Sequence, residues 1–263
     1  MLNKLYRLTA LSVALVFSSL AQATVVQFQT VLGPFEINLY DERMPATVAN
    51  FLDYVNSGAY DNVIVHRAVS NFVVQGGGFT YDGTPTFVSV PANAPVVNEP
   101  EFSNRRGTVA MAKLPGDPNS ATSEWFINLS NNSVNLDVQN SGFSVFGEVV
   151  GNGMDVIDAV NNLTLFNFGG GLTSLPLRDY TVQNQTDGVE VTDQHLVLVT
   201  AVVITDAATD TAANLSPVEN TLIDQVTPSA PPPPPGGGGS TSLEFLLMLG
   251  LLYFIRRRAN LAS

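Results

Sequence analysis

Short apolar runs, separated by turn-forming residues, make up the middle of the chain and constrain its fold more than any other feature. They are rich in Val, Ile and Phe, which is typical of strands, and lie at residues 25–29, 35–40, 63–65, 72–75, 107–112, 124–129, 144–149 and 196–204. Only two stretches carry apolar residues at helical spacing: one begins at Pro45 and ends at Gly58, and the other covers residues 154–160. Many short strands with two helices predict a mainly β fold, an antiparallel barrel or sandwich.

The first 23 residues are typical of an export signal. Lys4 and Arg7 precede an apolar run at residues 8–20, and Ala21-Gln22-Ala23 then gives the small-x-small pattern that signal peptidases cut. A buried first helix is the alternative interpretation. We expect signal peptidase to remove residues 1–23, so that the mature chain begins at Thr24 and folds outside the cytoplasm, in the periplasm or at the cell surface.

The C-terminal 59 residues divide into a spacer and an apolar segment. Residues 205–239 lack a sustained apolar pattern and end in five prolines and four glycines, which predicts a disordered linker. Residues 240–263 contain an apolar stretch at 243–255 followed by three arginines. As a helix these 13 residues would span about 20 Å, less than the ~30 Å hydrocarbon core, and the stretch includes Glu244.

This order of spacer, apolar segment and basic end is similar to the GlyGly-CTERM sorting signal of exported bacterial proteins. The resemblance implies cleavage near the glycines by a rhomboid-type protease, and a simple tail anchor is the alternative. The arginines would remain on the cytoplasmic side. We therefore expect contact with a membrane only through this segment.

Charge excludes several classes of partner. Between Thr24 and Gly239 there are six basic residues against 22 acidic ones, a formal charge of −16. Nucleic acid and anionic lipid are poor partners for such a surface. We assign the acidity to solubility, and since nothing in the sequence indicates an oligomer we expect a monomer.

Metal and nucleophile chemistry has few candidate residues. The chain has no cysteine and only two histidines, His66 and His195, so a zinc site made mainly of Cys and His is excluded. Neither histidine lies in a nucleophile motif, and His195 is predicted to be an ordinary loop residue. The acidic residues lack the spacing of a metal loop, and the glycines at 76–78 indicate a turn or bulge because no P-loop lysine follows them. We expect no cofactor and no metal.

The block at residues 65–79 is the most informative in the chain. It reads Val-His-Arg-Ala-Val-Ser-Asn-Phe-Val-Val-Gln-Gly-Gly-Gly-Phe and resembles the cyclophilin pattern Phe-His-Arg-(Ile/Val)-Ile-Pro-Gly-Phe-Met-x-Gln-Gly-Gly-(Asp/Gly)-Phe. Further matches follow in family order at residues 50–58, 106–112, 120–128 and 145–149. The resemblance, strongest to bacterial periplasmic members, implies that residues 24–204 form a closed antiparallel eight-stranded β-barrel capped by two α-helices.

The resemblance also implies a function and a site. The function is peptidyl-prolyl cis-trans isomerisation at X-Pro bonds of other exported proteins, which assists their folding. Arg67 falls on the catalytic arginine and Gln75 on the residue that holds the substrate backbone. The other implied substrate-binding residues are Phe72, Val73, Phe126 and Leu136 in the proline pocket, His66, Glu124 and Phe143 along the groove, and Ala112 and Lys113 at its edge.

These residue types suit a reaction that breaks no covalent bond. Rotation of an X-Pro amide removes its resonance, against a barrier of ~18–20 kcal/mol. The lone pair then localises on the proline nitrogen, where a guanidinium can donate a hydrogen bond that the planar ground state accepts poorly. Such differential binding of the transition state accelerates the step.

Departures from the family pattern leave questions open. Glu124 replaces the usual glutamine, and its carboxylate could hold Arg67 in place or compete with substrate for it. Asn135 replaces a Trp or Phe, which predicts weak cyclosporin binding. We expect the insertion at residues 163–192 to form long loops. Two other functions remain open: a catalytically weak peptide-binding or chaperone module at the cell surface, and an adhesive surface scaffold.

Overall fold

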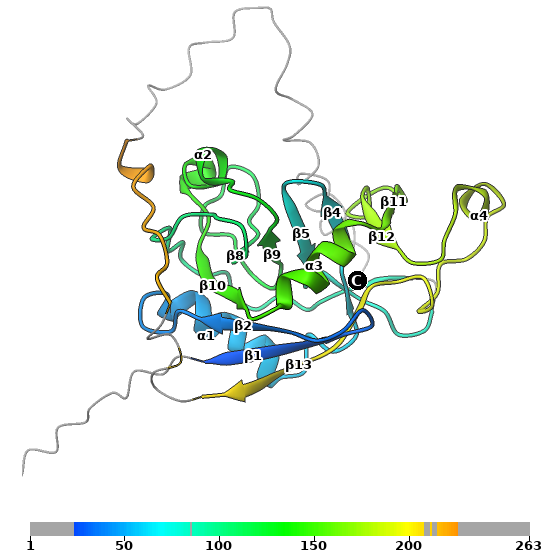
Figure 1. Cartoon of the computed structure of the whole chain (residues 1–263), viewed down its shortest axis with the longest axis horizontal. Coiled ribbons are helices and arrows are strands. Elements are labelled where there is room, and N and C mark those ends of the chain that lie inside the picture. The colour runs from blue at the N-terminus through cyan, green and yellow to red at the C-terminus, as the bar shows by residue number, and fades with distance from the viewer. Residues whose placement is uncertain (1–23, 85, 208–210, 212–214, 226–263) are drawn as a thin grey trace, which may run out of the picture.

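One strongly curled antiparallel sheet forms the body of the protein in the computed structural model, which describes residues 24–84, 86–207, 211 and 215–225 (Figure 1). In spatial order its strands are β4 (Arg67–Val69), β5 (Val73–Gly76), β9 (Trp125–Asn128), β8 (Thr108–Met111), β10 (Val145–Val150), β2 (Phe35–Leu39), β1 (Val25–Thr30), β13 (Leu198–Asp206), β3 (Val63–Ile64), β6 (Phe79–Thr80) and β7 (Val88–Ser89). The mainly β, antiparallel architecture predicted from the sequence is confirmed.

The chain itself joins the two halves of this sheet. β3 pairs with β13 and β4 pairs with β5, and the segment between β3 and β4 is only Val65 and His66. The Val65 N–H donates to the Val197 carbonyl at 2.9 Å, and the His66 N–H donates to the Gln75 carbonyl at 3.1 Å. This bent segment therefore pairs with both neighbours and curls the sheet back on itself.

The sheet has eleven described strands instead of the predicted eight. The difference has a physical reason: the bend at Val65 and His66 divides one strand into β3 and β4, and the short β6 and β7 extend the edge beside β3. Counting the bent segment once and setting β6 and β7 aside leaves eight strands. Each of the eight apolar runs forms one of these strands, with ends within two residues of those predicted.

The two predicted helices are α1 (Pro45–Asn56) and α3 (Gly153–Asn161). α1 begins at a proline, which is pre-organised for a first helical turn, and it buries Phe51, Tyr54 and Val55. α3 packs on β10 and β2. The described residues also form two short helices, α2 (Ser133–Leu136) and α4 (Val182–Thr186), and two 3-10 turns, η1 (Gln139–Ser141) and η2 (Ile223–Gln225). None of the described helices is long and apolar enough to cross a membrane.

The interior is built around aromatic rings. Phe28 stacks on Phe35 with ring centroids 4.7 Å apart and meets Trp125 edge-on at 5.1 Å. Trp125 and Val74 are fully buried, while their chain neighbours Phe126 and Val73 line a surface pocket. Because side chains alternate along a strand, β5 and β9 separate this core from the pocket.

The insertion at residues 163–192 is not the set of long loops that we expected. It contains a hairpin of β11 (Thr164–Phe166) and β12 (Leu175–Leu177) followed by α4. Apolar residues of the insertion complete a second small core, made of Ile64, Tyr81, Phe166, Leu175, Leu177, Tyr180, Leu196 and Leu198. The burial of these side chains gives the insertion a defined structure beside β4, where the Ala68 N–H donates to the Ser174 carbonyl at 2.9 Å.

The folded unit also extends past the expected boundary at Ile204. β13 continues to Asp206, and residues 215–225, here called the C-terminal strap, lie along the domain toward α2 (orange in Figure 1). Asn220 of the strap is only 6% exposed. Part of the predicted linker at 205–239 is therefore ordered against the domain. The predicted signal peptide, the Pro/Gly-rich part of the linker and the sorting segment lie outside the described residues.

Candidate active site

All eleven site residues named from the sequence line one pocket. Its volume is about 90 Å³, several times the ~10–15 Å³ that one water molecule needs, so it has room for a ring of the size of proline. The residues that line it are His66, Arg67, Phe72, Val73, Gln75, Ala112, Lys113, Glu124, Phe126, Leu136 and Phe143, together with Gln139, Gly170, Gly171 and Thr173.

Strand register brings the central residues together. Arg67 on β4 is the partner of Gln75 on β5, and Gln75 is in turn the partner of Phe126 on β9. Directly opposed residues on neighbouring strands point to the same face of a sheet. The three side chains therefore form a row across the pocket, from a cation through an amide to an aromatic ring.

The apolar part of the pocket joins this row to the segment after α2. Phe126 meets Phe143 edge-on, with ring centroids 5.6 Å apart. Leu136 and Phe143 are both buried, and the Phe143 N–H donates to the Leu136 carbonyl at 3.0 Å. The two ends of the 136–143 loop are thus tied together beside Phe126, which gives the pocket an apolar wall.

A hydrogen-bonded chain crosses the polar part. Arg67 Nη1 donates to Gln75 Oε1 at 3.3 Å, and Gln75 Nε2 donates to Glu124 Oε2 at 2.7 Å. His66 Nε2 lies 3.5 Å from the same carboxylate oxygen. Since a carboxylate accepts but does not donate, Glu124 fixes the Gln75 amide with its oxygen toward Arg67.

The charge of Glu124 also affects Arg67 directly. Burial lowers the pKa of the Arg67 guanidinium, and the negative charge of Glu124 opposes that shift. Glu124 therefore favours the charged guanidinium and orients the amide beside it. Both effects support the interpretation that Glu124 helps to hold Arg67.

Lys113 is buried at the edge of the pocket. Its ammonium donates to Asn98 Oδ1 at 3.1 Å, to the Asn140 carbonyl at 3.0 Å and to the Gly142 carbonyl, and its Nζ lies 4.7 Å from the centroid of the Phe143 ring. Burial lowers the pKa of Lys113 to about 8, against the opposing charge of Asp117. Lys113 thus binds the loop that carries the apolar wall.

Four lining residues were missed by the sequence reasoning. Gln139 lies in an irregular turn, and Gly170, Gly171 and Thr173 lie in the insertion that we expected to form long loops, to which the sequence assigned no role. The glycine run at 169–171 was the only sequence feature that could have pointed to these residues. It does not show that the run lies at the pocket, because the contact between the insertion and β4 depends on the second core.

Other candidate residues fall outside the pocket lining. His195 lies in a turn before β13, where its Nδ1 accepts from the Thr192 N–H at 3.1 Å, consistent with a loop residue. Asn135 is exposed on α2. Gly77 has a φ of +80°, and a Cβ there would lie 2.5 Å from the Ser123 carbonyl oxygen. The glycines at 76–78 therefore form part of a turn that packs tightly on its neighbours.

Comparison with known proteins supports the family resemblance found in the sequence. Residues 25–185 match the model of the family described as cyclophilin type peptidyl-prolyl cis-trans isomerase. A peptidyl-prolyl cis-trans isomerase of Acinetobacter baylyi is 40% identical over 149 residues, which cover 56% of this chain and 76% of that protein. Peptidyl-prolyl cis-trans isomerase B of Escherichia coli is 37% identical over 168 residues, covering 62% of this chain and 98% of that protein.

Isomerase A of Dickeya dadantii is 40% identical over 150 residues, covering 56% of this chain and 76% of that protein. These identities extend over most of each relative, and the matched segment of this chain holds every site residue named from the sequence. The chain belongs to the cyclophilin-type peptidyl-prolyl cis-trans isomerases.

Proposed function

We propose that this isomerase acts on exposed X-Pro bonds of exported proteins, with Arg67 as its catalytic residue. One observation carries the proposal: the register of β4, β5 and β9 sets Arg67, Gln75 and Phe126 side by side at the rim of an apolar pocket. The cation can contact the proline nitrogen, the amide a backbone carbonyl and the aromatic ring the proline ring.

Each part of the pocket has a role in this mechanism. The proline ring enters between Phe72, Phe126 and the wall that carries Phe143. Gln75 holds a backbone carbonyl of the substrate, which limits rotation to one side of the X-Pro bond. The Arg67 guanidinium donates to the proline nitrogen as its lone pair localises, an interaction that is stronger in the twisted state than in the planar one.

The expected rate acceleration is of a size that one guanidinium in a partly desolvated pocket can supply. A reduction of ~7 kcal/mol in the barrier would correspond to about 10⁵-fold acceleration. A hydrogen bond from a half-buried charged donor and fixation of the proline ring would both contribute to this reduction. No bond is made or broken, and the proposed reaction uses no cofactor.

Export is supported by the sequence of residues 1–23, where two basic residues, an apolar run and a small-x-small pattern follow one another. In this proposal the protein works in the periplasm or at the cell surface, and the segment at 240–263 sorts or anchors it. Mass spectrometry of the protein from cells tests the first step. A mature N-terminus at Thr24 is expected, and a retained Met1 in the cell interior would contradict export.

A catalytically weak peptide-binding module is the second candidate. The observation that favours it is the bond from Gln75 Nε2 to Glu124, because an amide committed to a carboxylate has one N–H fewer for substrate. Refolding of a protein limited by prolyl isomerisation separates the two. The enzyme accelerates the slow phase at substoichiometric concentration, whereas a binding module acts only in proportion to the complex formed.

A further inference from the structure

The C-terminal strap at residues 215–225 lies outside the part of the chain that matches the family model. It begins with Leu215 packed against the main core and then runs beside the segment at residues 100–103. The Ser103 N–H donates to the Val218 carbonyl, and the Asn220 N–H donates to the Glu101 carbonyl, both at 2.7 Å. The strap is thus attached to the domain through its backbone.

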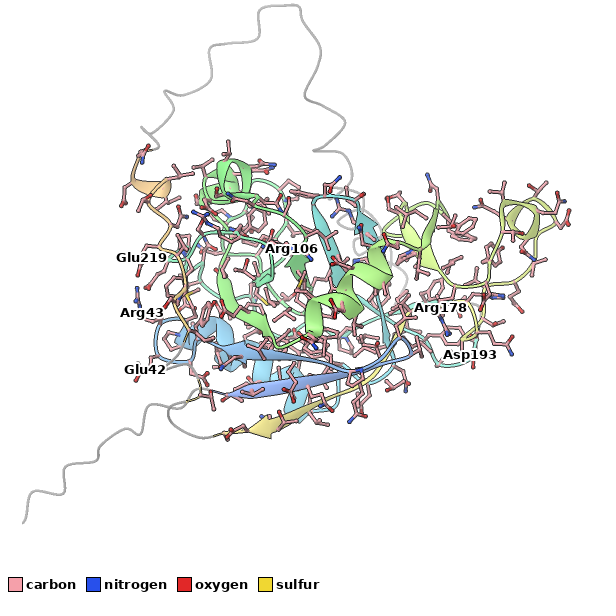
Figure 2. The ribbon with its side chains drawn as sticks, in the orientation of Figure 1. Glu42, Arg43, Arg106, Arg178, Asp193 and Glu219 are labelled. Atoms are coloured by element: carbon pink, nitrogen blue, oxygen red, sulfur yellow. The ribbon has the colours of Figure 1, made fainter. Side chains whose placement is uncertain are left out.

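A surface ion pair supports this attachment. Arg43 Nη2 lies 3.1 Å from Glu219 Oε1 and 3.0 Å from Glu101 Oε2, and Figure 2 shows Arg43 and Glu219 at the same edge of the molecule. All three side chains are about half exposed. Exposed pairs of this kind contribute little to stability, so the ion pair is a suitable place for a control substitution.

Asn220 connects the strap to Asp137, at the end of α2 beside the pocket. Its Nδ2 donates to the Asp137 carbonyl at 2.8 Å and to the Pro100 carbonyl at 3.2 Å, while its Oδ1 accepts from the backbone N–H groups of Leu222 and Ile223, each at 3.1 Å. Both ends of the buried amide are therefore used. A buried amide with all these partners is costly to replace.

Asp137 is the point at which the strap meets the pocket. It caps the C-terminus of α2 and directly follows Leu136, which lines the pocket. Residues 136–143, here called the groove wall, continue through Gln139 to Phe143, and both of these also line the pocket. A displacement of the Asp137 carbonyl therefore moves the residues that contact a bound proline.

The groove wall has little freedom to absorb such a displacement. Beyond its carbonyl, Asp137 accepts hydrogen bonds at its buried carboxylate from Ser103 Oγ at 2.6 Å and from the Asn104 N–H at 2.7 Å. Gly142 packs so tightly that a Cβ there would lie 2.8 Å from the Asp137 oxygen and 3.3 Å from Asn220 Nδ2. Close packing of this kind transmits strain between neighbours.

We propose that Asn220 is a positioning residue of the groove wall, through which the C-terminal strap sets the affinity of the pocket for proline-containing peptides. The inference rests on the proposed isomerase function. Because Arg67 and Gln75 are held by β4 and β5 and not by the groove wall, the strap acts on substrate binding more than on the rotation step.

The test compares Asn220→Asp and Asn220→Ala with the parent in the full-length chain. Asp keeps an acceptor for Leu222 and Ile223 but places an oxygen against the Asp137 and Pro100 carbonyls. KM for a short X-Pro peptide should rise about 3- to 10-fold, the loss expected for one or two neutral hydrogen bonds, with kcat within about twofold of the parent. Glu219→Gln, which removes only the surface ion pair, should change neither constant.

Hydrogen exchange provides a readout that does not depend on activity. In the Asn220 variants the amides of Gly142 and Phe143, which bond within the groove wall, should exchange faster, while those of β10 should not. Asn220→Ser, which can still donate one hydrogen bond, should give a smaller effect and serves if the other variants do not fold.

Two results would overturn the inference. One is an unchanged KM in a variant whose strap amides exchange freely, since the strap would then be detached without effect on the pocket. The other is unchanged exchange of Gly142 and Phe143 in every Asn220 variant. If the parent itself lacks isomerase activity, the proposed function fails separately, and the exchange comparison alone decides the question of the strap.

Discussion

Glu124 lies at the edge of the pocket and contacts both its polar residues and the solvent. Its side chain is 22% exposed, so it is accessible from the groove yet bonded to Gln75 on the inner side. The arrangement makes the carboxylate a support for the Arg67–Gln75 pair. The same carboxylate also leaves a negative charge at the rim, where a basic substrate residue would be favoured over an acidic one.

Substitution of Glu124 separates its role as an acceptor from its charge. Glu124→Gln keeps an oxygen that can accept from Gln75 Nε2, so kcat/KM should stay within about threefold of the parent. Glu124→Ala releases the Gln75 amide and should lower kcat/KM by about 3- to 10-fold. A rise in kcat/KM for Glu124→Ala in the peptide assay would show instead that the carboxylate competes with substrate.

Lys113 predicts a pH dependence of substrate binding. The ammonium donates to three oxygens, those of Asn98, Asn140 and Gly142, but burial of its charge lowers the pKa of Lys113 to about 8. The ordinary pKa of Lys113 is 10.5, so an opening of the groove wall that exposed this amine above pH 8 would take up a proton, and the closed wall becomes more stable as the pH rises. KM for an uncharged X-Pro peptide should therefore fall above pH 8, measured between pH 6.5 and 9.5.

The control distinguishes this effect from alkaline unfolding. The folded-state pKa of Lys113 is below its ordinary value of 10.5, so the unfolded chain binds more protons between these two pH values. The contribution of Lys113 to the free energy of unfolding therefore increases with pH in this window. In Lys113→Met the fall in KM above pH 8 should disappear, and a variant that retained it would exclude Lys113 as its source.

The glycines at the end of β5, Gly76 and Gly77, determine how closely β5 and β9 approach. A Cβ at Gly76 would lie 2.7 Å from the Trp125 ring, and one at Gly77 would lie 2.5 Å from the Ser123 carbonyl oxygen. Trp125 in turn packs on Phe28 in the core. The turn that follows Gln75 is therefore possible only with residues that lack a side chain.

Gly77→Ala should lower the free energy of unfolding by about 2–4 kcal/mol, because it adds a backbone clash to an unfavourable positive φ. Gly83→Ala is the matched control: its φ is +92° but a Cβ there would meet no atom within 4 Å, so it should cost only about 1–2 kcal/mol. Urea unfolding measures both. Equal losses in the two variants would show that the clash at Gly77 is relieved by a small shift.

The strands of the barrel could be predicted because each reads as a local apolar run. β4, β6, β7, β11 and β12 could not, since none of them coincides with one of the eight apolar runs and they are stabilised by contacts with distant parts of the chain. Ser174 is an example: its bond to Ala68 depends on a core that combines Leu175 and Leu177 with Ile64 and Leu198. No local pattern contains this information.

The residues that line the pocket were selected from the sequence for a different reason. Composition and spacing alone would have treated Phe72, Phe126 and Leu136 as ordinary core residues, and it was the family resemblance that selected them. The bond from Gln75 to Glu124 and the attachment of the 136–143 loop by Lys113 and Asn220 were not predictable, because they depend on side-chain geometry between segments that are far apart in sequence.

At the scale of the whole molecule, the formal charge of −16 between Thr24 and Gly239 gives the protein a field that attracts cations. A prolyl peptide flanked by lysines should have a kcat/KM about 2- to 5-fold higher at 20 mM than at 500 mM salt, because salt screens this attraction. A neutral peptide of the same length should show no such change. Equal salt dependence for both peptides would exclude steering by the acidic surface.

We propose that Arg67, held beside Gln75 at the rim of the pocket, lowers the barrier to X-Pro rotation. The most direct measurement is the rate of cis-to-trans conversion of a short X-Pro peptide by the full-length chain, beside Arg67→Ala and Arg67→Lys. The parent should accelerate the conversion strongly, and Arg67→Ala should lose about 100-fold or more of kcat/KM. Arg67→Lys should lie between them, because an ammonium keeps the charge but not the planar donor. A parent that accelerates the conversion while Arg67→Ala remains equally active would exclude Arg67 as the catalytic residue.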